Sequence, residues 1–495
     1  MKRKLIVCLS ALLVCLSFVS CGDDDEKPKN TDTSQSEEIT VPTAAKEELE
    51  VPLTADYNQY EFKVLTSGSG GNYNDFMYEE EPALALDKAQ YKRKLTVESN
   101  YNIQITETAI SSGNTSGSGQ GFMELSLAAN SGDFIYDLAL IGGYDVSTAA
   151  YNGYLYDMNS VPGIDLTKSW WDQNAVESLS VKDIVFFTAG ELSQSRADAA
   201  FCIMFNKKIA ADYSIENPYD MVKNKTWTIE NFAELCKTVT EDLNQDDSMD
   251  ENDRYGLLVL NDSLLGMVNA AGERCAVVND SGEIELTLYT ERTLSAIEQY
   301  LNIAYNKDYA LMYQRHGSGR TFEDTLWNGE HGLFWTTYMK MIPRYREMES
   351  DFGILPYPML DKEQDGYHST IFPFISQFVC IPLNQEDIER TGVITEALAY
   401  HGQKIVRPAY YDVTLVGQST RDEESVEMLD IIFDSLVYDI GYIYQIGTYN
   451  KQLIYMISND ETNFSSRYEA NKQAAETLLT KVNEAYAMAV NEWKQ

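Results

Sequence analysis

The residues with the strongest chemical signal form an acidic stretch of twelve, 242–253. Oxygen-bearing side chains fall at positions 1, 3, 5, 9 and 12, and the residue at position 7 offers its backbone carbonyl, as in the EF-hand calcium loop. Hard oxygen donors in this order suit Ca²⁺. We expect a structural calcium ion held by Asp242, Asn244, Asp246, Ser248, Asp250 and Asp253.

Two residues depart from the calcium-loop pattern. Asp247 occupies position 6, where Gly usually makes the turn, and Asp253 at position 12 is one methylene shorter than the usual Glu. The alternative is a solvated acidic turn between a helix over Ile229–Asp242, capped by Thr228, and a strand over Tyr255–Leu260. Without a cation, the clustered carboxylates would repel one another.

Common catalytic motifs are missing from the sequence. It contains no GxSxG elbow, no P-loop, no HExxH and no CxxC, and no two of its four His stand at a metal-ligand spacing. We therefore expect no enzymatic activity. A secreted carbohydrate-active enzyme with paired carboxylates stays open as an alternative, because 77 acidic residues bring some pairs together by chance.

Length and charge narrow the class of protein. The chain has 495 residues, 44% of them hydrophobic, which is enough for two domains or one large two-lobed body. Its 38 basic residues against 77 acidic ones give a net charge of −39. A surface this acidic repels phosphate backbones, so we expect no nucleic-acid partner.

The N-terminus predicts export and a lipid anchor. Residues 1–20 begin with basic residues and continue as an apolar run too short to span a membrane, so they form a signal peptide. The stretch from Phe18 to Gly22 resembles the bacterial lipoprotein cleavage box, in which Cys21 becomes the lipidated first residue. Residues 21–56 lack aromatic side chains and predict a disordered linker. We expect a protein anchored to the extracytoplasmic face of the cell membrane.

Four cysteines remain in the body that follows: Cys202, Cys236, Cys275 and Cys380. An exported protein can pair them as disulfides, and their apolar neighbours fit buried free thiols equally well.

Strand-like and helix-like patterns alternate from residue 57 onward and predict an α/β fold with open sheets. Predicted strands cover 61–66, 136–141, 184–188, 200–205, 255–260, 332–335, 352–355 and 378–381. The pattern becomes helical towards the C-terminus, beginning at Ser425–Leu436. Ligands in open α/β sheets bind beyond the carboxyl ends of the strands, so we expect a cleft near the Gly-rich segments 67–72 and 142–143.

Several segments in order resemble family 1 extracellular solute-binding proteins of ABC importers. They are the lipoprotein start, Gly132–Leu138, Trp170–Asp172, Phe205–Lys207, Asn217–Tyr219 with Lys225–Thr228, Asp253–Gly256 and Gly353–Pro358. The resemblance implies a two-lobed, periplasmic-binding-protein-like (type II) fold with a hinge and a helical C-terminal segment. It places residues 57–170 and 371–420 in lobe 1, and residues 171–370 with most of the tail, 421–495, in lobe 2.

On this resemblance the protein captures a sugar or oligosaccharide by hinge closure, acts as a monomer and delivers the sugar to the permease subunits of an ABC transporter. Sugar sites combine aromatic platforms with polar side chains at their edges. The expected ligand-binding residues lie where loops meet the cleft: Asn72, Tyr73, Tyr144, Asp145, Ser195, Arg196, Trp335, Tyr338, Tyr410, Tyr411 and Asp412. A surface lipoprotein without a role in transport is the remaining alternative.

Overall fold

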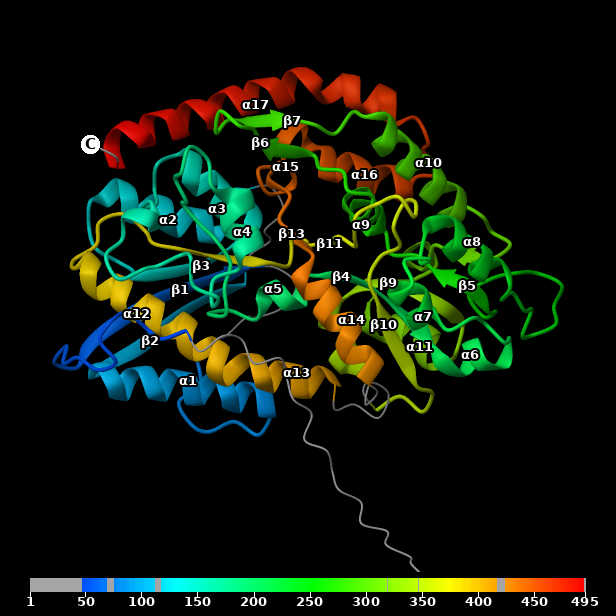
Figure 1. Ribbon diagram of the computed structural model, residues 1–495, viewed down its shortest axis with the longest axis horizontal. Helices are drawn as coiled ribbons and strands as arrows, with labels where there is room; N and C mark the ends of the chain where they lie inside the picture. The colour runs from blue at the N-terminus through cyan, green and yellow to red at the C-terminus, as the bar shows by residue number, and fades with distance from the viewer. Residues whose placement is uncertain are drawn as a thin grey trace, which may run out of the picture. The chain divides into compact units, whose positions relative to one another are not determined.

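Two β-sheets, each with helices packed around it, form the centres of two lobes in the computed structural model (Figure 1). The structure describes residues 47–68, 75–111, 117–317, 319–345, 347–415 and 423–493, with the backbone alone at 412–415 and 423. Cys21, Asn72 and Tyr73 lie outside the described residues, and so do the signal peptide and most of the linker.

The first sheet has the strand order β12-β3-β1-β2. Strand β1 runs parallel to β2 and β3, and β12 is antiparallel to β3. Both β3 and β12 are buried along their whole length, and apart from Gln377 at the start of β12 their residues are apolar or Gly. The bounds are β1 (Tyr60–Gly68), β2 (Ile103–Ser111), β3 (Leu138–Gly142) and β12 (Gln377–Cys380).

Helices cover both faces of the first sheet. Figure 1 shows α1 and α12 on one side of it and α2 and α3 on the other. The helices of this lobe are α1 (Ala85–Tyr101), α2 (Gln120–Ser131), α3 (Gly143–Tyr151), α4 (Gln173–Leu179), α12 (Ile388–His401) and α13 (Arg407–Leu415).

The second sheet has the order β10-β4-β9-β5-β8. Strands β9, β5 and β8 are parallel, while β4 is antiparallel to both of its neighbours. The strands are β4 (Phe201–Asn206), β5 (Tyr255–Leu258), β8 (Ala310–Leu311), β9 (Gly332–Tyr338) and β10 (Phe352–Leu355). The helices of this lobe are α6 (Lys207–Asp212), α7 (Pro218–Lys223), α8 (Ile229–Lys237), α9 (Ser263–Ala270), α10 (Glu291–Ala304), α11 (Arg320–Asn328), α14 (Glu423–Asp434) and α16 (Tyr449–Ser458).

Three connecting segments, 188–200, 369–379 and 435–439, lie side by side between the two sheets. Thr188 and Val379 exchange backbone hydrogen bonds, and Phe372 N–H donates to the Ala199 carbonyl at 3.0 Å. The third segment joins through the parallel pair β11 (Ser369–Thr370) and β13 (Leu436–Val437). The chain therefore passes between the lobes along three hydrogen-bonded segments.

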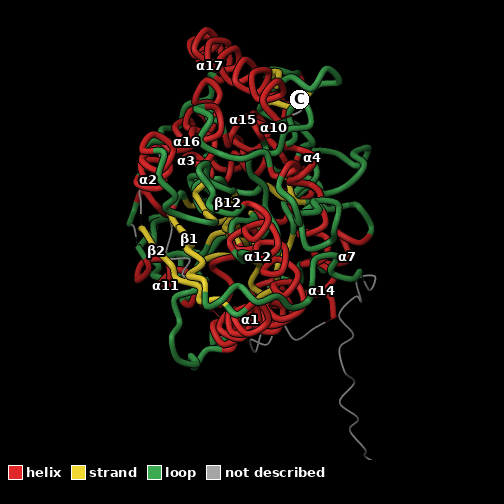
Figure 2. Tube along the Cα trace, turned by 90° about the vertical axis from the view of Figure 1, so that its left-hand side faces the viewer, coloured by secondary structure: helices red, strands yellow, loops and turns green. Residues whose placement is uncertain are grey.

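The C-terminal helix α17 (Phe464–Trp493) contacts both lobes, and Figures 1 and 2 show it along one edge of the molecule. Its Asn483 side chain bonds the backbone of Ile284, in the hairpin of β6 (Ala276–Val278) and β7 (Ile284–Leu286). At its far end, Trp493 packs against Tyr156 with ring centroids 4.9 Å apart. Two short helices, α5 (Ser195–Asp198) and α15 (Ile440–Ile443), complete the α-helices of the described residues.

Cysteines 202, 236, 275 and 380 are free thiols in the structure, and all four are buried. Burial raises the pKa of each thiol, which keeps it protonated and unreactive. In the part of the chain that the structure describes, no helix is both long enough and apolar enough to span a bilayer.

A buried carboxylate joins two adjacent tryptophans in the first lobe. The indole N–H groups of Trp170 and Trp171 donate to the two oxygens of Glu396, each at 2.9 Å. Glu396 is 2% exposed. Burial raises its pKa from 4.5 to about 7, although the two indole groups oppose the shift.

This raised pKa predicts a pH-dependent stability. Between pH 4.5 and about 7 the folded protein holds a proton on Glu396 that the unfolded chain has released, so this group's contribution to the free energy of unfolding falls as pH rises through that range. The free energy of unfolding, measured by urea titration at several pH values, should fall less steeply with pH in Glu396→Gln than in the parent. Glu389→Gln, exposed on the same helix, is the control and should match the parent. Equal slopes in all three proteins would contradict the prediction.

Candidate functional site

A cavity of about 570 Å³ lies between the lobes, and its size is typical of small-molecule sites. The first lobe supplies the N-terminal end of α1, and the second supplies the start of α11 and the 3₁₀ segment Met339–Tyr345 that follows β9. The first connecting segment and α13 complete the wall. The lining residues are Leu84, Ala85, Leu86, Asp87, Gln194, Asp198, Arg320, Lys340, Pro343, Arg344, Glu347 and Tyr410.

The Asp198 carboxyl joins the connecting segment to both α13 and the second lobe. Tyr410 O–H donates to Asp198 Oδ1 at 3.1 Å. Burial raises the pKa of Asp198 to about 6, and Lys340 partly opposes the shift. Burial also lowers the pKa of Lys340, while Asp198 raises it. Each charged group therefore stabilises the other inside the cavity wall.

The wall from the second lobe follows directly from the end of a central strand. Strand β9 ends at Tyr338, and the polypeptide turns at once into the segment that carries Lys340 and Arg344. Arg344 is held by ion pairs to Glu323 at 2.9 Å and Asp324 at 2.8 Å, and it also donates to the Arg320 carbonyl. This position agrees with the rule that ligands bind beyond the carboxyl ends of parallel strands.

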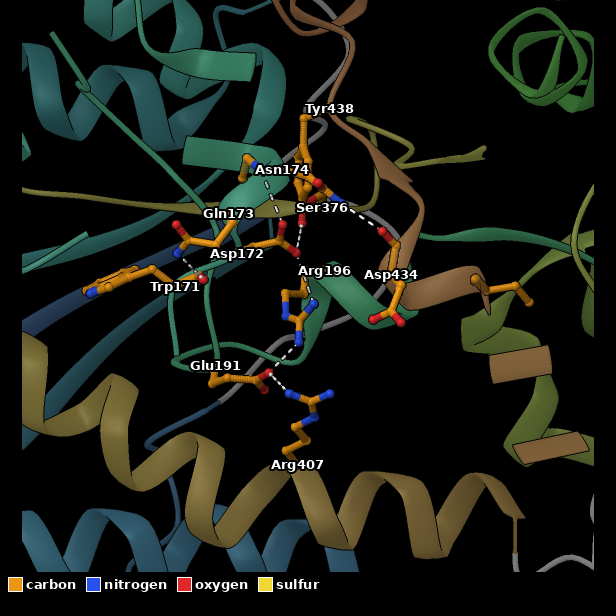
Figure 3. A network of polar contacts seen from close by, with 12 residues as sticks. Trp171, Asp172, Gln173, Asn174, Glu191, Arg196, Ser376, Arg407, Asp434 and Tyr438 are labelled. Carbon is orange, nitrogen blue, oxygen red and sulfur yellow. Dashed lines mark hydrogen bonds and ion pairs between the residues drawn. The ribbon is translucent and has the colours of Figure 1, made fainter. Parts of the chain in front are cut away.

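An ionic network beside the cavity links the connecting segments (Figure 3). Arg196 donates to Asp172 at 3.0 Å and to Glu191, while Tyr438 O–H donates to the same oxygen of Asp172 at 2.9 Å. Arg407 of α13 reaches Glu191 at 3.3 Å. Burial disfavours the charge on Arg196, but Glu191 and Asp172 outweigh that cost and raise its pKa.

A second link ties the connecting segments to the first sheet. The Gln377 N–H donates to Ser195 Oγ at 3.0 Å. The side-chain amide of Gln377 donates to the carbonyls of Ser67 at 3.1 Å and Leu140 at 3.3 Å, near the ends of β1 and β3. Ser195 is thus engaged with backbone, and Ser195 and Arg196 both connect the segments between the lobes.

Of the residues expected from sequence to bind the ligand, Tyr410 lines the cavity between the lobes. Tyr411 is buried beside it, with its O–H directed at Asp430. Tyr338 is partly exposed at the end of β9, next to Phe201 and Phe372. For Asp412, only the backbone, within α13, is described.

Three other expected residues are buried in the lobes. Tyr144 receives a hydrogen bond from the Asn450 side chain at 2.9 Å, and Asp145 accepts the Gly119 N–H at 2.8 Å. Trp335 is 2% exposed and packs against the rings of Tyr313, Trp327 and Tyr345. None of these three side chains lines the cavity.

Sequence reasoning did not select most of the cavity residues. Asp198, Arg320, Lys340, Arg344 and the start of α1 were not among the expected site residues, although the rule about strand ends points to the segment after β9. Their charged side chains resemble the rest of an acidic, highly charged surface, so they carry no local motif.

The predicted calcium loop folds as a tight turn closed by its own carboxylates. Asp242 accepts the N–H groups of Gln245 and Asp247, and Asp253 accepts those of Leu243 and Asp250. Asp247 adopts φ 64°, so it has the left-handed conformation for which calcium loops use Gly. Among the described residues, no group of three or more His, Cys, Asp or Glu is arranged to hold a metal ion.

Solved structures of ABC substrate-binding proteins share this fold. No protein-family model matches the chain, and no curated protein matches its sequence. The cyclic α-maltosyl-1,6-maltose binding protein from Arthrobacter globiformis matches with a TM-score of 0.55 and 13% identity, over 85% of this chain and 98% of that one. The maltose/maltodextrin-binding domain MalE from Bdellovibrio bacteriovorus, bound to maltotriose, matches with a TM-score of 0.53 and 14% identity, over 85% of this chain and 99% of that one.

An ABC substrate-binding protein from Listeria monocytogenes in complex with cycloalternan also matches, with a TM-score of 0.53 and 13% identity, over 87% of this chain and 100% of that one. The predicted two-lobed, periplasmic-binding-protein-like α/β fold is therefore confirmed.

Proposed function

We propose that this chain is the solute-binding protein of an ABC importer, which captures a carbohydrate between its lobes and delivers it to the permease. The observation that carries the proposal is the cavity of about 570 Å³ with walls from both lobes. The similar proteins in complex with maltotriose and cycloalternan support a saccharide as the guest. The cavity offers side chains that donate and accept hydrogen bonds with sugar hydroxyls.

The proposed mechanism is closure of the lobes around the sugar. A ligand that contacts α1 on one lobe and the segment after β9 on the other stabilises the arrangement in which these elements are close. The hydrogen-bonded connecting segments keep the two lobes in register while their angle changes. The permease then recognises the closed form, and no covalent bond is made or broken.

Thermal melting of the protein against a panel of saccharides tests this proposal. A sugar that binds only the folded state raises the melting temperature with concentration, by the equivalent of about 2.7 kcal/mol at a hundred times its Kd. The sugar should be recovered unchanged after incubation, whereas a carbohydrate-active enzyme would shorten or rearrange it. If no sugar in the panel changes the melting temperature, a surface lipoprotein without a transport role would be favoured.

We further propose that the exported protein is held at the extracytoplasmic face of the membrane by lipid on Cys21. The predicted linker is shorter than the sequence suggested, because residues 47–56 pack on the first lobe: Val51 is buried, and Tyr101 O–H donates to the Pro52 carbonyl at 2.6 Å. The part of the linker before residue 47 would let the folded body move above the bilayer. Replacing Cys21 by Ser removes the acylated thiol, so the protein should appear in the culture medium rather than in the membrane fraction. Unchanged membrane retention of this variant would contradict the anchor.

We keep a structural calcium ion in the loop 242–253 as a proposal. Calcium would neutralise carboxylates that otherwise repel one another, so a chelator should lower the melting temperature and added Ca²⁺ should restore it. Asp246→Asn removes one predicted ligand charge and should weaken the response to Ca²⁺. The control is Asp280→Asn, outside the loop, which should respond as the parent does. A melting temperature that changes neither with chelator nor with added Ca²⁺ would contradict the proposed calcium site.

A further inference from the structure

The C-terminal helix α17 reaches from the second lobe to the first. Figure 1 shows its first turns beside α10 and α16, and its last turns on the side of α2 and α3. Its thirty residues give a length of about 45 Å. Since its two ends contact different lobes, a change in the angle between the lobes must move one end of α17 relative to the surface beneath it.

The second lobe holds α17 by directional hydrogen bonds and stacked rings. Tyr468 stacks on Tyr449 of α16 with ring centroids 5.1 Å apart, and the Tyr449 O–H donates to the Tyr468 carbonyl at 3.0 Å. Further along, the Asn483 side chain accepts the Ile284 N–H and donates to the Ile284 carbonyl, each at 2.9 Å. Hydrogen bonds weaken steeply when their angles are distorted, so these contacts fix the position of α17 on this lobe.

The first lobe contacts α17 in a different way, through rings and apolar side chains. The amine of Lys481 lies 4.4 Å from the centroid of the Tyr151 ring, at the end of α3. Trp493, in the last turn, packs against Tyr156 with ring centroids 4.9 Å apart. Among the residues that the structure describes, α17 forms no hydrogen bond or ion pair with the first lobe. Apolar contacts are not directional, so they do not fix the position of the helix as hydrogen bonds do.

Packing between α17 and the first lobe is also incomplete. A groove of about 200 Å³ lies between them, and Met488 beside it is 66% exposed. Protein interiors contain few voids larger than a water molecule, and packed helices that slide past each other do so by small steps. Space at this contact therefore allows the last turns of α17 to shift on the first lobe. The groove is lined by Tyr151, Leu155 and Phe186 of the first lobe and by Ala485, Met488 and Ala489 of α17.

Other contacts between the second lobe and the same side of the first restrain a rotation less. Ser147 Oγ donates to the Ile443 carbonyl at 3.0 Å, but Ile443 lies only four residues beyond the third connecting segment, where a rotation moves the chain little. Lys182 and Glu283 form an ion pair at 3.0 Å, and exposed pairs of this kind contribute little. The far end of α17 has the longest lever arm.

We propose that α17 is a strap that restrains the angle between the lobes. Its first part is attached to the second lobe, and its last turns slide over the first lobe when the angle changes. The ring contacts of Trp493 stabilise the arrangement without sugar, so a ligand must supply the free energy that moves the lobes away from it. This inference goes beyond sugar capture, since it concerns the protein without a ligand.

Distance measurements on the sugar-free protein test the strap. Nitroxide labels at Lys92→Cys on α1 and Thr321→Cys on α11, with Cys21→Ser in the same chain, report the separation of the lobes by double electron–electron resonance. Trp493→Ala removes the largest ring of the sliding contact and should broaden the distance distribution. Tyr455→Ala is the control, because that ring is 47% exposed and packs against Arg467, in the part of α17 attached to the second lobe. It should give the distribution of the parent.

A second variant changes the same contact in the opposite direction. Ala485→Leu adds apolar volume to the groove, so it should tighten the contact and narrow the distribution. Loss of stability alone cannot produce both effects. Thermal melting of each variant confirms that it is folded.

The outcomes decide the strap independently of sugar capture. A distribution of unchanged width in either Trp493→Ala or Ala485→Leu would overturn the strap, and so would equal broadening in Tyr455→Ala. Because every measurement is made without sugar, the result does not depend on whether a saccharide panel identifies a ligand. Failure of the strap would leave sugar capture standing, and a panel without a ligand would leave the strap standing.

Discussion

Replacement of Arg196 by Met should lower the free energy of unfolding by about 3–5 kcal/mol, the cost of leaving buried charges without their partner. The Arg196 side chain is 13% exposed and bridges Asp172 and Glu191, whose side chains are 6% and 10% exposed. Without the guanidinium, the two carboxylates remain in a poorly solvated site, where Arg407 compensates Glu191 alone. Urea unfolding followed by circular dichroism measures the loss.

Two further variants separate charge from packing at this position. Lys208→Met removes a solvent-exposed ion pair with Asp212 and Glu330, and it should cost less than about 1 kcal/mol. The triple variant Arg196→Met, Asp172→Asn, Glu191→Gln neutralises the whole group and should recover much of the lost stability. A single Arg196→Met variant as stable as the parent would show that the network contributes nothing to the link between the segments.

Replacement of Trp335 by Ala should cost about 3–5 kcal/mol of unfolding free energy, as for other large aromatic residues removed from a core. The indole lies on β9, pairs in register with Met204 and Leu258 of the neighbouring strands, and packs against three aromatic rings. Truncation leaves a cavity that these rigid strands cannot fill.

Leu127→Ala is the control for Trp335, because that leucine is 57% exposed on α2 and should cost little. If Trp335→Ala instead kept the parent's stability and lost sugar binding, Trp335 would be a ligand platform, and the cavity described here would be the wrong site.

The alternation of strands and helices was visible in the sequence because the strands are either almost continuously apolar, as in β3 and β4, or alternate between polar and apolar residues, as at the start of β1. Six predicted strands correspond to β1, β3, β4, β5, β9 and β12, and the prediction of Phe352–Leu355 matches β10 at both ends. The edge strand β2 was missed because only its first residues alternate between buried and exposed positions, and polar Glu and Thr residues follow them. The segment 184–188 is apolar yet makes isolated bridges only, since it leads into the connecting segments.

Errors in element length explain much of what the sequence did not show about the site. The strand predicted at 332–335 extends to Tyr338, so Trp335 lies inside the sheet rather than at its edge. The helix predicted over 229–242 ends at Lys237, and the acidic loop is correspondingly longer. Ligand-facing positions depend on where each strand ends, and local sequence patterns define ends least well.

The cavity also depends on contacts between residues far apart in the chain. Asp198, Tyr410 and Lys340 come together because the connecting segments bring both lobes and α13 to one place. Sequence spacing carries no record of that arrangement. The resemblance to solute-binding proteins implied the two-lobed fold, but the identity of the charged residues that line the cavity, such as Arg320 and Lys340, follows only from the folded chain.

The distance between the lobes, measured with and without sugar, tests the central claim most directly. Nitroxide labels at Lys92→Cys on α1 and Thr321→Cys on α11 report on opposite walls of the cavity, and Cys21→Ser with the four buried native thiols keeps labelling specific. Double electron–electron resonance should show a shorter mean distance between the labels and a narrower distribution when the saccharide with the largest thermal shift is saturating. An identical distribution with that sugar bound would contradict capture by closure of the lobes.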